Sequence, residues 1–159
     1  MSDSHISPAP DPAAPTGDRF IDDYIAYLLA RASYLVSRRF HEELALKGIA
    51  VPDWRVLASL SDGDGVSLGA LARITLFKQP TLTKIVDRME ADGTVRRVPS
   101  TADRRKVLIT ITDEGRRLVA QLLQDAKRQE REVLADYTAD QRALLKGTLR
   151  DLIDRLDPD

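Results

Sequence analysis

Apolar residues recur at the 3.6-residue period of an amphipathic helix over three long stretches of the chain. These stretches, at 18–47, 113–137 and 139–156, predict three long helices. Asp18 is placed to cap the first helix and Gly48 to end it, because these residue types favour those positions. Each stripe is apolar along its whole length, so each helix must bury one face.

The middle of the chain predicts three shorter helices. Pro52 suits the first turn of the first one, and the loop SDGDG at 61–65 ends it. Ser67 is a good cap for the second, and Pro80 opens the third, which Gly93 closes. A short helix, a tight turn and a second amphipathic helix form the pattern of a helix-turn-helix, whose second helix enters the DNA major groove.

The last of these short helices has two distinct faces. One face is an apolar stripe that packs inward, formed by Leu82, Ile85, Val86 and Met89. The opposite face carries Thr81, Lys84 and Arg88. Lys and Arg side chains suit the acceptor atoms of guanine and the phosphates, so this outer face is the candidate for reading DNA.

Two short β-prone runs follow, TVRRVP at 94–99 and KVLITIT at 106–112, joined by the polar loop PSTADRR. This arrangement predicts a β-hairpin whose loop projects as a wing. In its second strand the alternation predicts one face packed on the helices, carrying Val107, Ile109 and Ile111.

Charge is concentrated in the same region, although the whole chain of 159 residues has a net charge of -1. Between Arg73 and Lys106 there are nine Lys and Arg residues against four Asp and Glu residues. A local excess of cations is what a polyanion-binding face needs, because phosphates are neutralised locally. A solvated charged surface is the alternative on charge alone.

The composition of the chain excludes several kinds of site and several classes of protein. The chain has no cysteine, which excludes disulfides, thiolate metal sites and thiol redox sensing. Two histidines, no Gly-rich phosphate loop and no carboxylate cluster leave nothing from which to build an enzyme site, so we expect no catalysis, no cofactor and no metal. No apolar run approaches the roughly 20 residues that span a bilayer, and no secretion signal is present, so a cytoplasmic protein without membrane contact is expected.

The long helices near the two ends of the chain lie outside the helix-turn-helix and wing. Thr138 and Gln141 have the spacing of a capping box at the start of the last one. One copy of the chain offers little surface to cover the terminal stripes, so we expect two copies to pack through them with twofold symmetry. A monomeric helical bundle is the alternative.

Several stretches in order resemble the MarR (multiple antibiotic resistance regulator) family of transcription factors over residues 18–156. They are WRVLASL at 54–60, SLGALARITLFKQPTLTKIVDRMEADGTVRR and DRRKVLITITDEG. The resemblance implies a mainly α-helical triangular homodimer with a small β-hairpin, in which terminal helices of both subunits pack together above two winged helix-turn-helix lobes. The expected segments are a disordered tail (1–17), a dimerisation helix (18–50), a winged helix-turn-helix DNA-binding domain (51–112) and C-terminal dimerisation helices (113–159).

The resemblance also implies which residues contact double-stranded DNA at a pseudo-palindromic operator. Those at or near the major groove are Gln79, Pro80, Thr81, Thr83, Lys84 and Arg88, and Ser67 and Lys78 complete the helix-turn-helix set. On the wing, Arg105 of the Asp103-x-Arg105 motif would enter the minor groove, oriented by Asp103, while Arg104 touches the DNA backbone. The alternatives are that Gln79 only caps its helix, and that Asp103 is a turn residue with Arg105 on the surface.

Members of this family are commonly repressors released by a small phenolic or aromatic carboxylate effector. The candidate effector-binding residues are Tyr34, Arg38, His41 and Trp54, because an Arg can pair with a carboxylate and aromatic walls can stack on a ring. The alternative assigns Tyr34 and Trp54 to the core and Arg38 and His41 to the solvated surface. A ligand-independent or architectural winged-helix DNA-binding protein is the alternative function.

Overall fold

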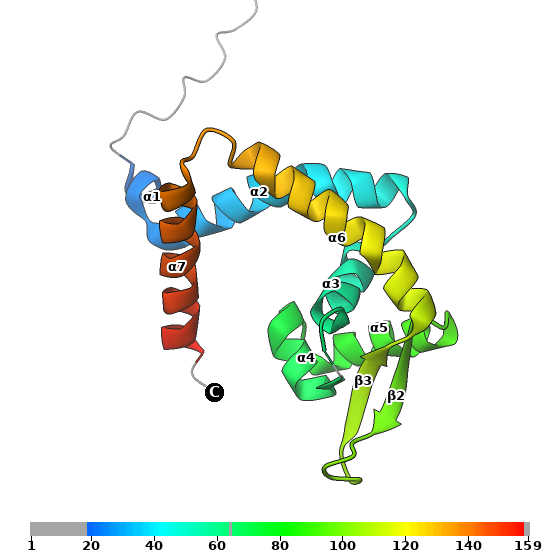
Figure 1. Cartoon of the computed structure of the whole chain (residues 1–159). Helices are drawn as coiled ribbons and strands as arrows, with labels where there is room; N and C mark the ends of the chain where they lie inside the picture. Colours follow the sequence, from blue (N-terminus) through cyan, green and yellow to red (C-terminus); the bar gives the residue numbers. More distant parts are fainter. Residues whose placement is uncertain (1–18, 64, 158–159) are drawn as a thin grey trace, which may run out of the picture. The chain divides into compact units, whose positions relative to one another are not determined.

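The computed structural model describes residues 19–63 and 65–157 and is mainly helical with one small sheet, as predicted (Figure 1). The predicted tail at 1–17 and the predicted cap Asp18 lie outside the described residues. In chain order the elements are α1 (Phe20–Asp23), α2 (Ile25–Leu46), α3 (Val51–Leu60), β1 (Val66–Ser67), α4 (Leu68–Thr75), α5 (Gln79–Ala91), β2 (Val95–Pro99), β3 (Val107–Ile111), α6 (Asp113–Val133) and α7 (Ala139–Leu156).

The chain divides into two compact units, Met1–Arg38 and Arg39–Asp159, with the boundary inside α2. In the first unit, the prediction of one uninterrupted helix from 18 to 47 is wrong, because Tyr24 adopts an extended conformation with ψ 110° between α1 and α2. Asp22 and Asp23 stand immediately before the interruption. Acidic groups are unfavourable at a helix C-terminus and favourable just before a helix N-terminus, so α2 starts afresh after them.

The core of the second unit lies among α3, α4, α5, the sheet and the start of α6. The predicted inner stripe of α5 is confirmed, since all four of its side chains are buried in the cluster that holds Leu57, Leu60 and Leu71. Gly93 ends this helix with φ 74°, as predicted. These contacts fix α5 so that its opposite face points outward.

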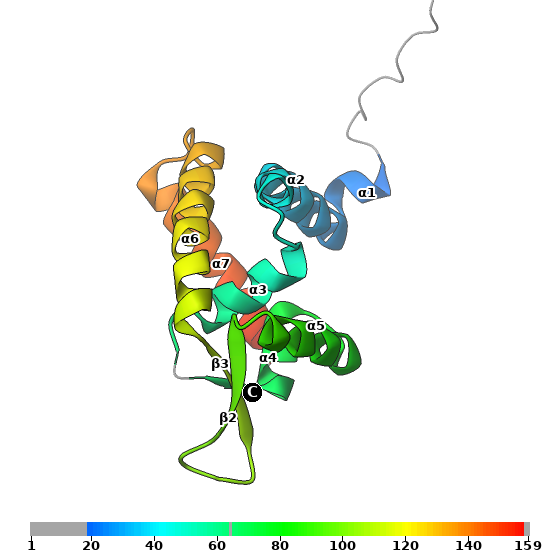
Figure 2. The same ribbon diagram turned by 90° about the vertical axis from the view of Figure 1, so that its right-hand side faces the viewer.

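The sheet has three antiparallel strands in the order β1-β3-β2. The hairpin of β2 and β3 is confirmed, and it extends away from α3, α4 and α5 in both views (Figures 1 and 2). The strand β1 was not predicted, because its two residues are too few to show an alternation. Val107 was predicted to pack on the helices but is 50% exposed, since it pairs with Pro99 at the far end of the hairpin, beyond the reach of the helices.

The end of the chain folds as two helices. The capping box of Thr138 and Gln141 is confirmed: Thr138 Oγ1 accepts from Gln141 N at 3.2 Å, and Gln141 Oε1 accepts from Thr138 N at 2.8 Å. However, α6 ends at Val133 rather than near 137, because the chain needs a turn before Thr138 can take the extended cap conformation. None of the described residues of α7 is buried within this chain.

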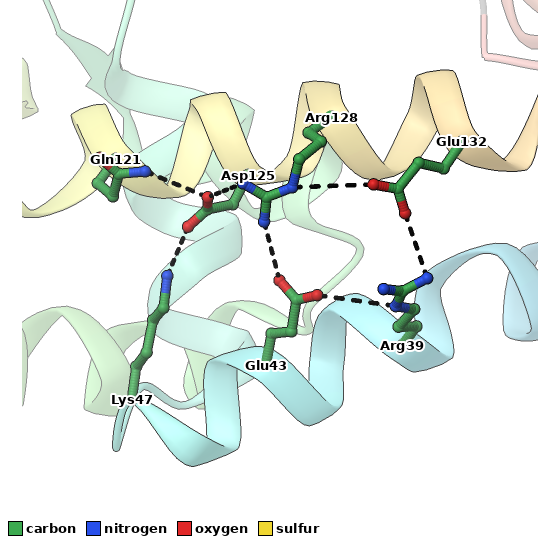
Figure 3. A network of polar contacts seen from close by, with 7 residues as sticks. All are labelled: Arg39, Glu43, Lys47, Gln121, Asp125, Arg128 and Glu132. Atoms are coloured by element: carbon green, nitrogen blue, oxygen red, sulfur yellow. Dashed lines mark hydrogen bonds and ion pairs between the residues drawn. The ribbon is translucent and has the colours of Figure 1, made fainter.

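Within the second unit, the last turns of α2 are attached to α6 by an apolar cluster and a polar network. Phe40 and Leu44 bury against Leu122. Next to them, the Asp125 side chain is only 4% exposed and accepts hydrogen bonds from Lys47 Nζ, Gln121 Nε2 and Arg128 Nη1. Figure 3 shows how the network continues through Glu43, Arg39 and Glu132. A buried carboxylate is stabilised only with such partners.

This network predicts a pH dependence of stability. The hydrogen bonds from Lys47 and Gln121 lower the pKa of Asp125 from its usual value. Because the folded pKa is depressed, the carboxylate stabilises the fold above the ordinary Asp pKa of about 3.9, and that contribution is lost as the pH falls through the lower folded pKa. Urea unfolding between pH 7 and pH 3 should therefore show a steeper loss in the parent protein than in Asp125→Asn. The exposed loop variant Asp62→Asn should keep the parent slope; parallel profiles for Asp125→Asn and the parent would contradict this prediction.

The turn between α4 and α5 carries a strained residue. Leu76 has φ 60° and ψ 31°, the left-handed conformation, and its side chain is 84% exposed. This conformation costs a non-glycine residue about 1–2 kcal/mol, whereas glycine costs about 0.5–1 kcal/mol through unfolded-state entropy. Leu76→Gly is therefore expected to raise the free energy of unfolding by about 0.5–1 kcal/mol. Leu76→Ala removes the same side chain but keeps the strain, so a glycine variant less stable than the alanine variant in urea would refute the argument.

Candidate nucleic-acid interface

The helix-turn-helix is built from α4, the turn at Leu76 and α5. Ser67 caps α4 as predicted, with its hydroxyl accepting from Ala70 N at 3.3 Å. The left-handed residue Leu76 turns the chain so that α5 begins after Lys78. This geometry places the first turn of α5 at the surface, where Gln79, Pro80 and Thr81 are all exposed.

The outer face of α5 forms a shallow hollow of about 350 Å³, lined by Pro80, Thr81, Lys84, Ile85 and Arg88. Four of the predicted contact residues thus line this hollow together: Pro80, Thr81, Lys84 and Arg88. An ammonium and a guanidinium beside a hydroxyl and an apolar floor provide donors for guanine and phosphate oxygens, and contact for a thymine methyl group.

The other predicted residues at the start of α5 take different positions. Lys78 is the N-cap residue of α5 and its side chain makes no capping hydrogen bond, while Gln79 is the first residue of the helix. Thr83 Oγ1 donates to the carbonyl oxygen of Gln79 at 2.9 Å, which turns its hydroxyl back onto its own helix. Lys78 and Gln79 are exposed, whereas Thr83 is half-buried.

Arg88 does not lie free on this face. Its guanidinium forms an ion pair with the Asp53 carboxylate of α3. Asp53 was not predicted as a partner of Arg88, since it lies 35 residues away in sequence and no local spacing links the two. The pair holds Arg88 at the rim of the hollow, where DNA phosphates would compete with Asp53 for it.

The wing loop is organised around Asp103. The Asp103 carboxylate accepts from the backbone N–H of Arg105 at 3.1 Å and pairs with Arg105 Nε at 3.2 Å. Its carbonyl oxygen accepts from Lys106 N at 2.8 Å. Asp103 is thus a turn residue and also a partner of Arg105, whose side chain is 91% exposed. The neighbouring Arg104 is exposed too, so the loop presents its cations to solvent.

Arg97 on β2 contrasts with these exposed cations. Its guanidinium forms ion pairs with Asp87 and Glu90 of α5, and Glu90 Oε1 also accepts from the backbone N–H of Arg97 at 2.8 Å. The backbone N–H and then the guanidinium of Arg97 lower the pKa of Glu90 from its usual value. From the sequence, Arg97 was only one of the cations between Arg73 and Lys106 (the basic segment), and these partners were not predicted.

The predicted effector residues fall in both units. Tyr34 and Arg38 lie in the first unit, and Tyr34 is exposed. In the second unit, Trp54 packs edge-on against Phe40 with ring centroids 4.9 Å apart and contacts both core clusters, which gives it a core role. His41 is half-buried, and burial and the nearby Arg55 lower its pKa. The effector pocket stays a prediction.

Within the described ranges, 19–63 and 65–157, no helix is long and apolar enough to cross a membrane. The same ranges contain no group of three or more His, Cys, Asp or Glu side chains placed to hold a metal ion.

Comparison with known proteins agrees with this arrangement. Residues 47–106 match the MarR family. A MarR family transcriptional regulator from Silicibacter pomeroyi DSS-3 is 41% identical, with a TM-score of 0.77 over 88% of this chain and 100% of that one. The homoprotocatechuate degradative operon repressor of Escherichia coli is 27% identical over 82% of this chain and 88% of its own length.

A small molecule regulates the DNA binding of a third relative. Bordetella bronchiseptica BpsR, whose DNA binding is regulated by 6-hydroxynicotinic acid, is 26% identical, and its solved structure superimposes with a TM-score of 0.72 over 89% of this chain and 99% of that one. These relatives are regulators of transcription and not enzymes. With its helix-turn-helix, its basic wing and these matches, the chain belongs to the MarR family of transcriptional regulators.

Proposed function

We propose that this protein is a homodimeric, sequence-specific DNA-binding repressor that a small aromatic acid releases from its operator. The observation that carries the proposal is the pairing, in one unit, of an exposed polar face on α5 with an exposed cationic wing tip at Arg105. A helix for the major groove and a loop for the adjacent minor groove are the two parts that a winged helix uses to read DNA.

The proposed contact set is the one expected from sequence. Thr81, Lys84 and Arg88 meet base edges and phosphates from α5, with Gln79, Pro80, Thr83 and Lys78 around the start of that helix and Ser67 at the start of α4. Arg105 enters the minor groove and Arg104 touches a phosphate. The exposure of Lys84 and Arg105 supports these roles.

Dimerisation is supported by apolar side chains that the chain leaves uncovered. On α7, Ile153 is 61% and Leu156 is 76% exposed, although their spacing continues an apolar stripe. Contiguous apolar surface of this kind marks an interaction site, and twofold pairing of identical copies covers it most simply.

Release by an aromatic acid is supported by two of the relatives. One is named as the repressor of a homoprotocatechuate degradative operon, and the DNA binding of another is regulated by 6-hydroxynicotinic acid. Such a ligand releases DNA only if it binds better to the conformation that cannot span two half-sites. Tyr34, Arg38, His41 and Trp54 are the proposed pocket residues.

A twofold-symmetric dimer is expected to bind an operator with two inverted half-sites. Footprinting on DNA fragments selected by the protein is expected to protect two inverted half-sites about one helical turn, roughly 10 base pairs, apart. The ratio of operator to random-duplex affinity at physiological salt should be about 10³ or more, which separates this function from architectural DNA binding.

A single asymmetric half-site would contradict the dimeric mode, and a ratio near one would contradict sequence-specific function. Titrating hydroxylated benzoates, phenylacetates and nicotinates into the complex tests the effector. Absence of both operator release and a thermal shift with all of them would favour a ligand-independent regulator.

A further inference from the structure

Arg97 connects the wing to α5, the recognition helix of the helix-turn-helix. It lies in β2, which forms an outer edge of the sheet, and three groups on it are engaged by α5: both guanidinium arms and the backbone N–H. Glu90 takes one arm and the N–H together, and Asp87, one helical turn earlier, takes the other arm. A strand edge is thereby covered by a carboxylate of the neighbouring helix.

The exposure of the guanidinium groups separates Arg97 from the other cations of the basic segment. The Arg97 side chain is 30% exposed, against 91% for Arg105 at the wing tip. A guanidinium occupied by two carboxylates has few donors left for phosphate, and leaving those carboxylates unpaired would place two negative charges near DNA.

We propose that Arg97, Glu90 and Asp87 form a positioning cluster that fixes the wing against α5, so that recognition helix and wing tip engage the same half-site. This inference rests on the proposed DNA binding and assigns Arg97 no DNA contact of its own.

The length of the hairpin makes such fixing necessary. A strand rises about 3.3 Å per residue, so the loop tip stands up to about 15 Å beyond Arg97. A tilt of about 10° at that point moves the tip by nearly 3 Å, which is enough to break a hydrogen bond. The short strand β1 supports the hairpin only at Leu108 and Ile109, and beyond them the hairpin has two strands and little stiffness of its own. The ion pairs from Arg97 to α5 add resistance to this tilt on the β2 side.

The experiment compares two substitutions near the end of α5, each of which replaces a carboxylate by a neutral amide. Glu90→Gln removes a negative charge and breaks the ion pair to Arg97. Asp92→Asn removes the same charge two residues later, where the carboxylate has no side-chain hydrogen bond or ion pair to the described residues. If only charge mattered, both variants would bind DNA more tightly, because each removes repulsion of the phosphates.

Affinities are measured on an operator duplex selected with the parent protein and on a random duplex, at one salt concentration. Glu90→Gln is expected to lose about three- to ten-fold on the operator, and nothing on random DNA, while Asp92→Asn loses nothing on either. Arg97→Lys is expected to behave like Glu90→Gln, because an ammonium keeps the charge but cannot bridge two carboxylates as a planar fork does.

The second readout is the coupling between Glu90→Gln and Arg105→Ala, the substitution at the wing tip. Arg105→Ala should cost at least about three-fold less operator affinity in the Glu90→Gln background than in the parent, because a displaced wing has already lost the contact. Circular dichroism and thermal melting confirm that each variant is folded, and Arg97→Lys carries the test if Glu90→Gln does not fold.

The outcomes separate the two proposals. If the parent protein prefers its operator and Glu90→Gln behaves like Asp92→Asn, or Arg105→Ala costs the same in both backgrounds, the positioning role is overturned while the regulator function stands. If the parent shows no preference for any duplex, the proposed function falls, and the positioning role falls with it.

Discussion

Replacing Gly115 with alanine is expected to lower the free energy of unfolding by about 3 kcal/mol, more than any other single methyl added to the described glycines. A Cβ built on Gly115 would lie 2.2 Å from the carbonyl oxygen of Thr94 and 2.8 Å from Ile111 Cγ1. The first of these atoms belongs to the backbone, which cannot rotate away as a side chain can. The start of α6 would have to separate from the base of the wing.

The site of this clash holds three elements together. Thr112 caps α6 through Gly115 N at 3.1 Å, its hydroxyl also donates to the Gly93 carbonyl at 2.7 Å, and its own N–H donates to the Thr94 carbonyl at 3.1 Å. The end of α5, the start of β2 and the start of α6 therefore meet at one threonine and one glycine. Pushing them apart breaks several hydrogen bonds at once, which is why we expect an effect at the upper end of the usual range.

Urea unfolding of Gly115→Ala beside Gly63→Ala measures this effect. The nearest atom to a Cβ on Gly63 is 4.0 Å away, and that residue does not have a positive φ, so its alanine variant should stay within about 0.5 kcal/mol of the parent. Equal unfolding midpoints for the two variants would show that the junction relaxes freely and that the clash carries no cost.

Replacing Arg105 with alanine is expected to weaken operator binding by about 1–3 kcal/mol, a loss of about 5- to 150-fold, without unfolding the protein. The side chain is almost wholly exposed and its only described partner is Asp103, so little folding energy is at stake. Its expected target is the negative potential of a narrow minor groove, which concentrates on arginine inserted there.

The measurement is a binding isotherm on the selected operator at fixed salt, together with Arg104→Ala as the matched cation. Loss of a phosphate contact at Arg104 should weaken operator and random duplex alike and lower the salt slope by about one. Arg105→Ala should instead reduce the preference for A·T-rich flanks. Unchanged affinity of Arg105→Ala at matched salt would refute its minor-groove role.

The sequence was informative wherever structure follows from local chemistry. The inner stripe of α5, the left-handed Gly93 and the capping box at Thr138 were all predictable, because each depends on residues within a turn or two of one another. The Asp103–Arg105 ion pair was predictable for the same reason, as its members are two residues apart.

Features that depend on packing between distant segments could not be predicted. Asp53 meets Arg88 across 35 residues, and Glu90 meets Arg97 only once the chain has turned at Gly93 and entered β2. The break at Tyr24 was missed because an apolar stripe can run through a one-residue interruption without an evident change of its period. The exposure of Val107 was missed because alternation says which face a residue occupies but not how far the helices reach along it.

The ion pairs formed by the cations between Arg73 and Lys106 change where the positive field of this segment is concentrated. Arg88, Arg97 and Arg105 each lie against a carboxylate, which offsets part of their field. The exposed cations for which no carboxylate partner is described include Lys78 and Lys84 at α5 and Arg104 and Lys106 on the wing, so positive charge gathers at two foci. A single focus attracts a polyanionic rod in any orientation, whereas two foci define a line. DNA drawn to both therefore arrives with its axis already aligned before any base is read.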